Sequence, residues 1–159
     1  MRTRIFTLFS LLAILLCSCA SASSGGIEVT NATVFLPVSA SMANMDNTDS
    51  MDGMNMNVSL AGYFQIKNNS SKDDRLLKVT CDFADAMMHE TQMNGDVASM
   101  VEMPYVDVPA GATVEFKTGG MHVMFMNPSQ ELKIGDKVTL NLQFENAGTV
   151  TVTATVMGH

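Results

Sequence analysis

Residues 137–156 read KVTLNLQFENAGTVTVTATV and contain two β-like runs on either side of a tight turn. Both runs are rich in Val and Thr, which are typical of strands. Between them, ENAG (145–148) ends in Gly148, at a place where a tight reversal needs a positive φ. This stretch therefore predicts two β-strands joined by a short turn.

The same pattern fills most of the chain beyond residue 26, where short β-like runs are separated by Gly, Pro, Asn and Asp. The nine runs lie at 27–38, 60–68, 75–83, 86–93, 97–103, 113–117, 122–126, 137–145 and 149–156. VPAG (108–111) and KIGD (133–136) supply two more turns with glycine. About nine short strands without a convincing helical period predict an all-β fold, an antiparallel sandwich or barrel.

The first 22 residues predict an export signal. Arg2 and Arg4 precede an uncharged apolar run at 5–16, which is too short to span a bilayer as a permanent helix. The A-x-A sequence at 20–22 would release a soluble protein, whereas LCSC, ending at Cys19, resembles a bacterial lipoprotein box and would place a lipid on Cys19. We therefore expect an exported protein in the bacterial periplasm or on the outer side of the cytoplasmic membrane, either soluble or lipid-anchored.

The rest of the chain, residues 23–159, is long enough for a single domain with its own core. Without Arg2 and Arg4 it keeps seven basic residues against 16 acidic ones, a net charge of −9. Such a chain is not expected to bind nucleic acid, and we expect a monomer. Of the three cysteines only Cys81 lies clear of the export signal, so no disulfide framework is expected. We expect Cys81 to be buried, because burial protects a single thiol in an oxidising compartment.

Residues 41–59, SMANMDNTDSMDGMNMNVS, break the strand pattern. The segment has five methionines and no Leu, Ile, Val or Phe before Val58, so it cannot bury itself well. It predicts a flexible loop between the first two strands, whose sulfurs could capture a soft metal weakly; the alternative is a disordered loop that merely tolerates methionine. The candidate auxiliary metal ligands are Met42, Met45, Met51, Met54 and Met56.

One face of the run HVMFM carries a histidine and two methionines. Strand alternation puts Val123 and Phe125 on one face and His122, Met124 and Met126 on the other. The apolar pair suits a core. The histidine and the thioethers therefore lie where a sandwich ordinarily has polar residues.

Two other runs show the same asymmetry. In AMMHETQM (86–93) Met87, His89 and Met93 share one face, and in VASMVEM (97–103) Met100 falls on the more polar side. Three strands thus offer His or Met on a face that does not need them for a core. For each histidine alone, the alternative is a hydrogen-bonded residue beside methionines that fill gaps.

A set of histidines and methionines favours one kind of metal. Thioether sulfur is a soft neutral donor, and imidazole binds metals when it is neutral. Without a thiolate or carboxylate at its centre, such a set suits Cu(I) better than Zn, Ca or Mg, and it avoids thiols that an oxidising compartment would convert to disulfides. The affinity for Cu(I) is expected to weaken as the pH falls from about 8 to about 5, because protonated imidazole cannot bind a metal.

The spacing H-x10-M-x21-H-x-M, from His89 through Met100 and His122 to Met124, resembles the signature of periplasmic PCuAC-type copper chaperones. The resemblance covers most of the mature chain. Its other landmarks are YFQIKN (63–68), DDRL (73–76), HE (89–90), PAG (109–111), GGMHVMFM (119–126) and LKIGDKV (132–138).

This resemblance implies a cupredoxin-like sandwich that holds one Cu(I) near its surface through His89, Met100, His122 and Met124. It also implies that the ion is delivered to an acceptor protein, typically in assembly of the CuA centre of cytochrome c oxidase. The Met-rich segment 41–59 and the lipid anchor depart from the usual pattern, and the segment could hold additional copper weakly.

Other functions compete with this interpretation. An electron-carrying cupredoxin needs two histidines and a cysteine thiolate around its copper, and no histidine lies within seven residues of Cys81. A metal-free β-sandwich used for structure or adhesion would leave the outward His and Met residues unexplained. An enzyme is not expected, since the sequence has no G-x-S-x-G elbow and no plausible Cys/His nucleophile pair.

Overall fold

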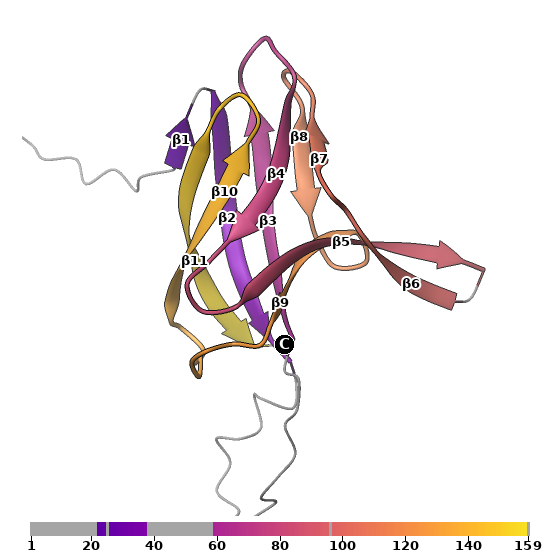
Figure 1. Ribbon diagram of the computed structural model, residues 1–159, viewed down its shortest axis with the longest axis vertical. Helices are drawn as coiled ribbons and strands as arrows, with labels where there is room; N and C mark the ends of the chain where they lie inside the picture. Colours follow the sequence, from indigo (N-terminus) through magenta and orange to yellow (C-terminus); the bar gives the residue numbers. More distant parts are fainter. Residues whose placement is uncertain (1–21, 25, 38–58, 96, 159) are drawn as a thin grey trace, which may run out of the picture.

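The computed structural model describes residues 22–24, 26–37, 59–95 and 97–158, and all regular elements in these ranges are β-strands (Figure 1). The strands are β1 (Ala22–Ser24), β2 (Ile27–Leu36), β3 (Leu60–Asn68), β4 (Asp74–Thr80), β5 (Asp85–Asn94), β6 (Val97–Glu102), β7 (Val106–Val108), β8 (Thr113–Phe116), β9 (Met121–Met126), β10 (Lys137–Phe144) and β11 (Thr149–Gly158). Each predicted run overlaps one strand, and the all-β class is confirmed. In the described ranges, no helix is long and apolar enough to cross a bilayer.

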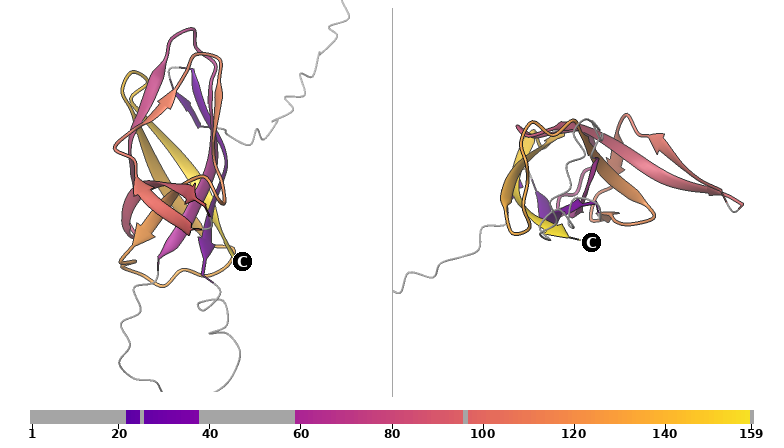
Figure 2. Two further views of the ribbon diagram at one scale, coloured as in Figure 1. Left: turned by 90° about the vertical axis from the view of Figure 1, so that its right-hand side faces the viewer. Right: turned by 90° about the horizontal axis from the view of Figure 1, so that it is seen from below.

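The strands form one continuous, strongly curved sheet. Its hydrogen-bonded order is β6-β5-β9-β3-β2-β11-β10-β4-β7, with β1 beside β2 and β8 beside β3. Figure 2 shows that the sheet curls into a barrel when seen from below. One pair departs from the antiparallel expectation, because β11 runs parallel to β2. A parallel pair needs a long connection, and here nearly the whole domain separates the two strands along the chain.

The core lies inside this barrel, on one face of each main strand. Alternate residues of β2, β3 and β10 are buried, as expected when one face packs and the other meets water. Val123 and Phe125 have no exposed surface, so their predicted core-facing orientation is confirmed. The three predicted turns also occur, with φ values of 71° at Gly111, 95° at Gly135 and 76° at Gly148.

The β5–β6 hairpin projects from the side of the barrel (Figures 1 and 2). β9 pairs with β5 only over Asp85–Glu90, so the second half of β5 leaves the barrel with β6 as its partner. Among the described strands, β6 pairs with β5 alone and forms one edge of the sheet. The faces of β5 and β9 that point away from the core therefore lie outside the barrel, at the base of this hairpin.

Candidate metal site

His89 and His122 are direct neighbours across two strands. The register of β5 against β9 pairs the two residues, so their side chains project from the same face of the sheet. Their ring centroids lie 6.0 Å apart, and the ring planes differ by 25°. Two imidazoles separated by 33 positions in the sequence thus lie side by side.

Met124 and Met100 share this face with the histidines. Met124 follows His122 by two residues on β9, and its partner on β5 is Met87. Met100 on β6 pairs with Thr91, which lies two residues beyond His89 on β5. All four predicted ligands therefore lie on one outward face, spread over β6, β5 and β9.

A cavity of about 260 Å³ lies beside this group. Met100, His122 and Met124 line it, together with Thr91 and Tyr63, which no sequence pattern had marked as functional. His89 does not line this cavity and joins the group through its ring contact with His122. The structure thus brings three predicted ligands to one cavity and the fourth to its border.

The ring of His122 is held in a defined orientation. Its Nδ1 lies 3.1 Å from the carbonyl oxygen of Gly120. A carbonyl oxygen can only accept, so Nδ1 carries the proton and donates it, which leaves the lone pair of Nε2 available for a metal. The side chain is only 7% exposed, so a neighbouring backbone group, and not bulk water, fixes this tautomer.

His89 differs from His122 in its hydrogen bonding. Its Nδ1 is buried and has no hydrogen-bond partner among the described residues. A buried polar atom without a partner is uncommon and costs free energy. A metal ion bound by this histidine would supply the missing interaction, so the side chain fits a ligand role.

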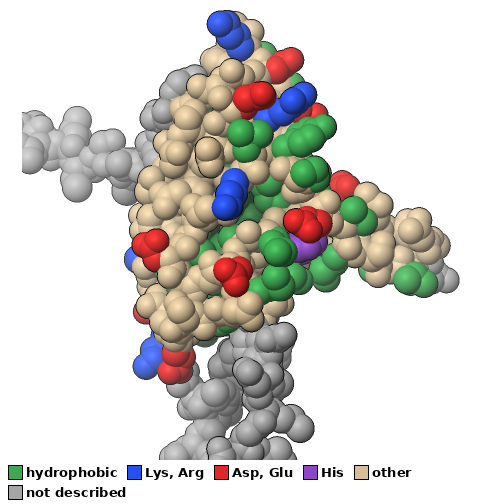
Figure 3. Space-filling view, viewed as in Figure 1, with side chains coloured by type: hydrophobic (Ala, Val, Ile, Leu, Met, Phe, Trp, Pro, Cys, Tyr) green, Lys and Arg blue, Asp and Glu red, His purple; other side chains and the backbone are tan. Residues whose placement is uncertain are grey.

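The outward face of β6, β5 and β9 has an unusual composition. Its apolar side chains are methionines plus one alanine, and it carries no Leu, Ile, Val or Phe. The residues of this face are Ala98, Met100 and Glu102 on β6, Asp85, Met87, His89, Thr91 and Met93 on β5, and His122, Met124 and Met126 on β9. Figure 3 shows a histidine at the base of the hairpin, with hydrophobic side chains and a carboxylate beside it.

The charge around this face is negative. Glu102 pairs directly with His89 across the hairpin. No lysine or arginine occurs from residue 79 to residue 116, whereas this stretch has seven acidic residues. An acidic surrounding attracts a cation to a site of neutral ligands.

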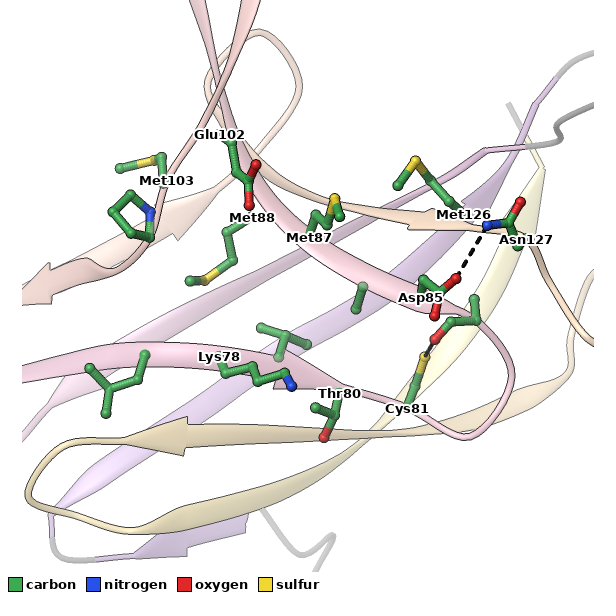
Figure 4. Close-up of a pocket in the computed structure, with 15 residues that line it drawn as sticks. Lys78, Thr80, Cys81, Asp85, Met87, Met88, Glu102, Met103, Met126 and Asn127 are labelled. Atoms are coloured by element: carbon green, nitrogen blue, oxygen red, sulfur yellow. Dashed lines mark hydrogen bonds between the residues drawn. The ribbon is translucent and has the colours of Figure 1, made fainter.

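A second cavity, of about 640 Å³, lies between the end of β4 and β5, and Cys81 lines it (Figure 4). Met87 and Met126 line it as well, but neither described histidine does. Cys81 is half-buried, and its Sγ lies 3.3 Å from the carbonyl oxygen of Ala84. Burial raises the pKa of this thiol, which keeps it protonated at neutral pH.

Some predicted residues fall outside the described ranges. These are the lipidation candidate Cys19 and the auxiliary methionines Met42, Met45, Met51, Met54 and Met56. Within the described ranges no three His, Cys, Asp or Glu side chains converge as a metal site, so a metal ion on this face depends on methionine sulfur.

Comparisons with solved structures support the cupredoxin-like fold. The copper-bound PCuAC domain from PmoF2 superposes with a TM-score of 0.64 at 21% identity, covering 86% of this chain and 97% of that domain. The Cu(I) form of DR1885 from Deinococcus radiodurans gives 0.54 at 25% identity, covering 81% and 78%. Its apo form gives 0.57 at 25% identity, covering 99% and 96%. The predicted fold class is confirmed.

Curated relatives match over part of their length. "Putative lipoprotein Lxx21020" from Leifsonia xyli subsp. xyli is 29% identical over 98 residues, which is 60% of this chain and 59% of the relative. "Uncharacterized protein RP573" from Rickettsia prowazekii is 28% identical over 88 residues, which is 54% of this chain and 49% of the relative. The family model described as "Putative lipoprotein LpqE-like" matches residues 27–156, from the start of β2 into β11. Because that match covers most of the chain, this protein belongs to the LpqE-like family.

Proposed function

We propose that this protein binds one Cu(I) ion through His89, Met100, His122 and Met124 and passes it to an acceptor protein outside the cytoplasm. The observation that carries the proposal is the register of β6, β5 and β9, which puts the four side chains on one outward face. The names of two similar structures, one copper-bound and one in a Cu(I) form, support the choice of metal. So does the donor set, because thioethers and neutral imidazoles suit Cu(I).

The four residues have different roles in this proposal. His122 offers Nε2, since Nδ1 is engaged with Gly120, and His89 gains a partner for its buried Nδ1, which has none among the described residues. Met124 is half-buried and holds the ion from the barrel side. Met100 is 60% exposed on the edge strand and is the outermost ligand.

This exposure suggests how the ion leaves. A ligand of the acceptor can approach from the side of Met100 and bind the copper before the inner ligands release it. Met100 carries no charge, so its departure needs no proton. Copper stays as Cu(I) throughout, and only metal–ligand bonds are exchanged.

The cellular setting follows from the family and from the sequence. The family description and one relative's name both contain the word lipoprotein, which supports export and a lipid on Cys19. The acceptor that we propose is a copper protein on the same side of the membrane, with the CuA subunit of cytochrome c oxidase as the first candidate from the resemblance to PCuAC chaperones. We propose no enzymatic activity.

The methionines of residues 41–59 remain proposed as an auxiliary, weaker capture site. Ser59, the last residue of this segment, lines the same cavity as His122 and Met124.

The electron-carrier alternative is not favoured by the geometry. Cys81 is in a different cavity from His122 and Met124, so the two histidines and a thiolate do not meet in the described structure. The metal-free alternative predicts no affinity for copper, and the first experiment tests it directly.

The test is an anaerobic Cu(I) titration in competition with a colorimetric chelator. Three proteins are compared with the unchanged chain: the double variant His122→Ala/Met124→Ala, a deletion of residues 42–56, and the control Met157→Leu. Met157 is an exposed methionine on β11, outside the three strands of the site, so its variant matches the loss of a surface thioether without touching the site.

We expect tight one-to-one binding that is lost in the double variant and kept in the deletion and in the control. Binding that survives in the double variant would refute the site on the barrel. No binding by the unchanged protein would leave the metal-free module as the better interpretation.

A further inference from the structure

Three methionines form a second cluster of sulfur next to the proposed His/Met site. Met87 and Met124 are direct partners across β5 and β9, one row beyond the pair His89 and His122. Met126 follows two residues after Met124 on the same face and is the diagonal neighbour of Met87. The row of soft donors on this face thus extends past His89 and His122, in the direction away from the hairpin tip.

The three side chains can reach a common point. Direct cross-strand partners have Cβ atoms about 4.5–5.5 Å apart, and diagonal neighbours about 7–8 Å or less. Methionine is long and unbranched, so its sulfur can swing over this distance. Figure 4 shows Met87 and Met126 projecting to the same side of the β5–β9 pair, with Met88 on the opposite side.

Packing does not explain these residues well. Met88, the neighbour of Met87, points into the core and is 6% exposed, whereas Met87 is 38% exposed. A surface position needs no apolar side chain, and a packed position on a strand is usually filled by Val, Ile or Phe. The outward face of these strands has none of them, and every apolar side chain on it except Ala98 carries a thioether sulfur.

The three methionines of this cluster line two different cavities. Met124 lines the smaller cavity with Met100 and His122, and Met87 and Met126 line the larger one. Met124 thus belongs to the proposed copper site and is also the cross-strand partner of Met87, which lines the larger cavity.

We infer that Met87, Met124 and Met126 form a second, all-thioether station for Cu(I) that shares Met124 with the His/Met site. This inference rests on the proposed function, because the station is useful as a route by which copper reaches or leaves the main site. Three neutral sulfurs suit Cu(I) and bind it without releasing a proton. When copper moves from the His/Met site to the second station, Met124 stays bound to the ion, and the sulfurs of Met87 and Met126 replace the histidine nitrogens. The oxidation state of copper does not change.

The experiment follows the methionine methyl groups by NMR during an anaerobic Cu(I) titration of the whole protein, labelled with carbon-13 at those groups. Signals are assigned with single Met→Leu variants. The first equivalent of Cu(I) is expected to shift the signals of Met100 and Met124. The second is expected to shift those of Met87 and Met126 and to shift that of Met124 again, because its sulfur then contacts both ions. In Met87→Leu and Met126→Leu the shifts at the other member of the pair are expected to be lost, whereas Met157→Leu keeps all of them.

The inference is overturned if the signals of Met87 and Met126 do not move up to two equivalents of Cu(I). It is equally overturned if, in the Met87→Leu variant, the signal of Met126 still moves as in the unchanged protein. Failure of the proposed His/Met site has a different signature, since the signal of Met100 would then stay unmoved during the first equivalent.

Discussion

The chemistry of His122 depends on the two residues before Met121. Gly119 has a φ of 76°, which lets the chain turn between β8 and β9. The turn brings the carbonyl oxygen of Gly120 to the Nδ1 of His122, and that contact fixes which ring nitrogen stays available. At the scale of single residues, the GG pair thus orients the ring of His122 and leaves its Nε2 available.

Gly62 is the residue at which one added methyl group should cost the most stability. A Cβ at this position would lie 2.6 Å from Cε2 of Phe125, closer than packed atoms can come. Phe125 is fully buried and cannot move away freely, so Gly62→Ala is expected to lower the free energy of unfolding by about 1–3 kcal/mol. Denaturant unfolding measures the change. The control is Gly120→Ala, whose Cβ would meet its nearest atoms at 3.7 Å; equal stability of the two variants would contradict the close packing of β9 on β3.

The element that decides the site is the pair β5–β9. Its register aligns His89 with His122 and Met87 with Met124. A slip by one residue would turn Val123 toward water and His122 toward the core, so the buried face fixes the register and the register fixes the site. Core packing and metal chemistry therefore depend on the same strand pairing.

The turn between β10 and β11 is tied to β4 by a buried carboxylate. Asp74 is 6% exposed, and it accepts hydrogen bonds from the backbone N–H groups of Asn146 and Ala147, each at 2.9 Å. Asp74→Ala leaves both donors without this acceptor, and we expect the free energy of unfolding to fall by about 1–3 kcal/mol. The control is Asp107→Ala, which removes an exposed ion pair with Arg75 and should cost about 1 kcal/mol or less. Denaturant unfolding compares them, and a larger loss in the control would refute the role of Asp74.

At the scale of the whole molecule, the barrel leaves one outward face open to function. The projecting hairpin and β9 carry the proposed soft ligands, and two cavities border them. The barrel itself is closed by apolar packing on the inner face, so the outer ligands are not needed for folding. We therefore expect a stable fold without metal and a further gain in stability when the metal binds.

This gain can be measured as a thermal shift. A ligand that binds only the folded protein, at a free concentration about 100 times its Kd, adds about 2.7 kcal/mol to the free energy of unfolding. In a chain of this size about 1 kcal/mol raises the Tm by about 2–4 °C, so saturating Cu(I) should raise it by roughly 5–10 °C. Anaerobic calorimetry measures the shift, which should persist in Met157→Leu and disappear in His122→Ala/Met124→Ala. An unchanged Tm in the native protein would argue against copper bound by the barrel.

Much of the fold could be predicted from local patterns. The run 60–68 corresponds to β3 residue for residue, and Val123 and Phe125 point inward as alternation predicted. β7 was missed because three residues are too few for a periodic signal, and the parallel pairing of β11 with β2 was missed because no local pattern encodes it. Alternation put Met87 on the outward face, but no spacing rule indicated that Met124 would lie opposite it.

The sequence by itself determined the all-β class, the two faces of regularly alternating strands such as β3 and β9, and the soft, uncharged character of the donors, because these depend on residue type and on a period of two along such strands. Only the tertiary structure decided which residues of different strands became neighbours: His89 beside His122, Met87 beside Met124, and Cys81 in another cavity. The physical reason is that strand register comes from burying one whole face of the sheet, a collective property of the barrel that no short stretch of sequence contains.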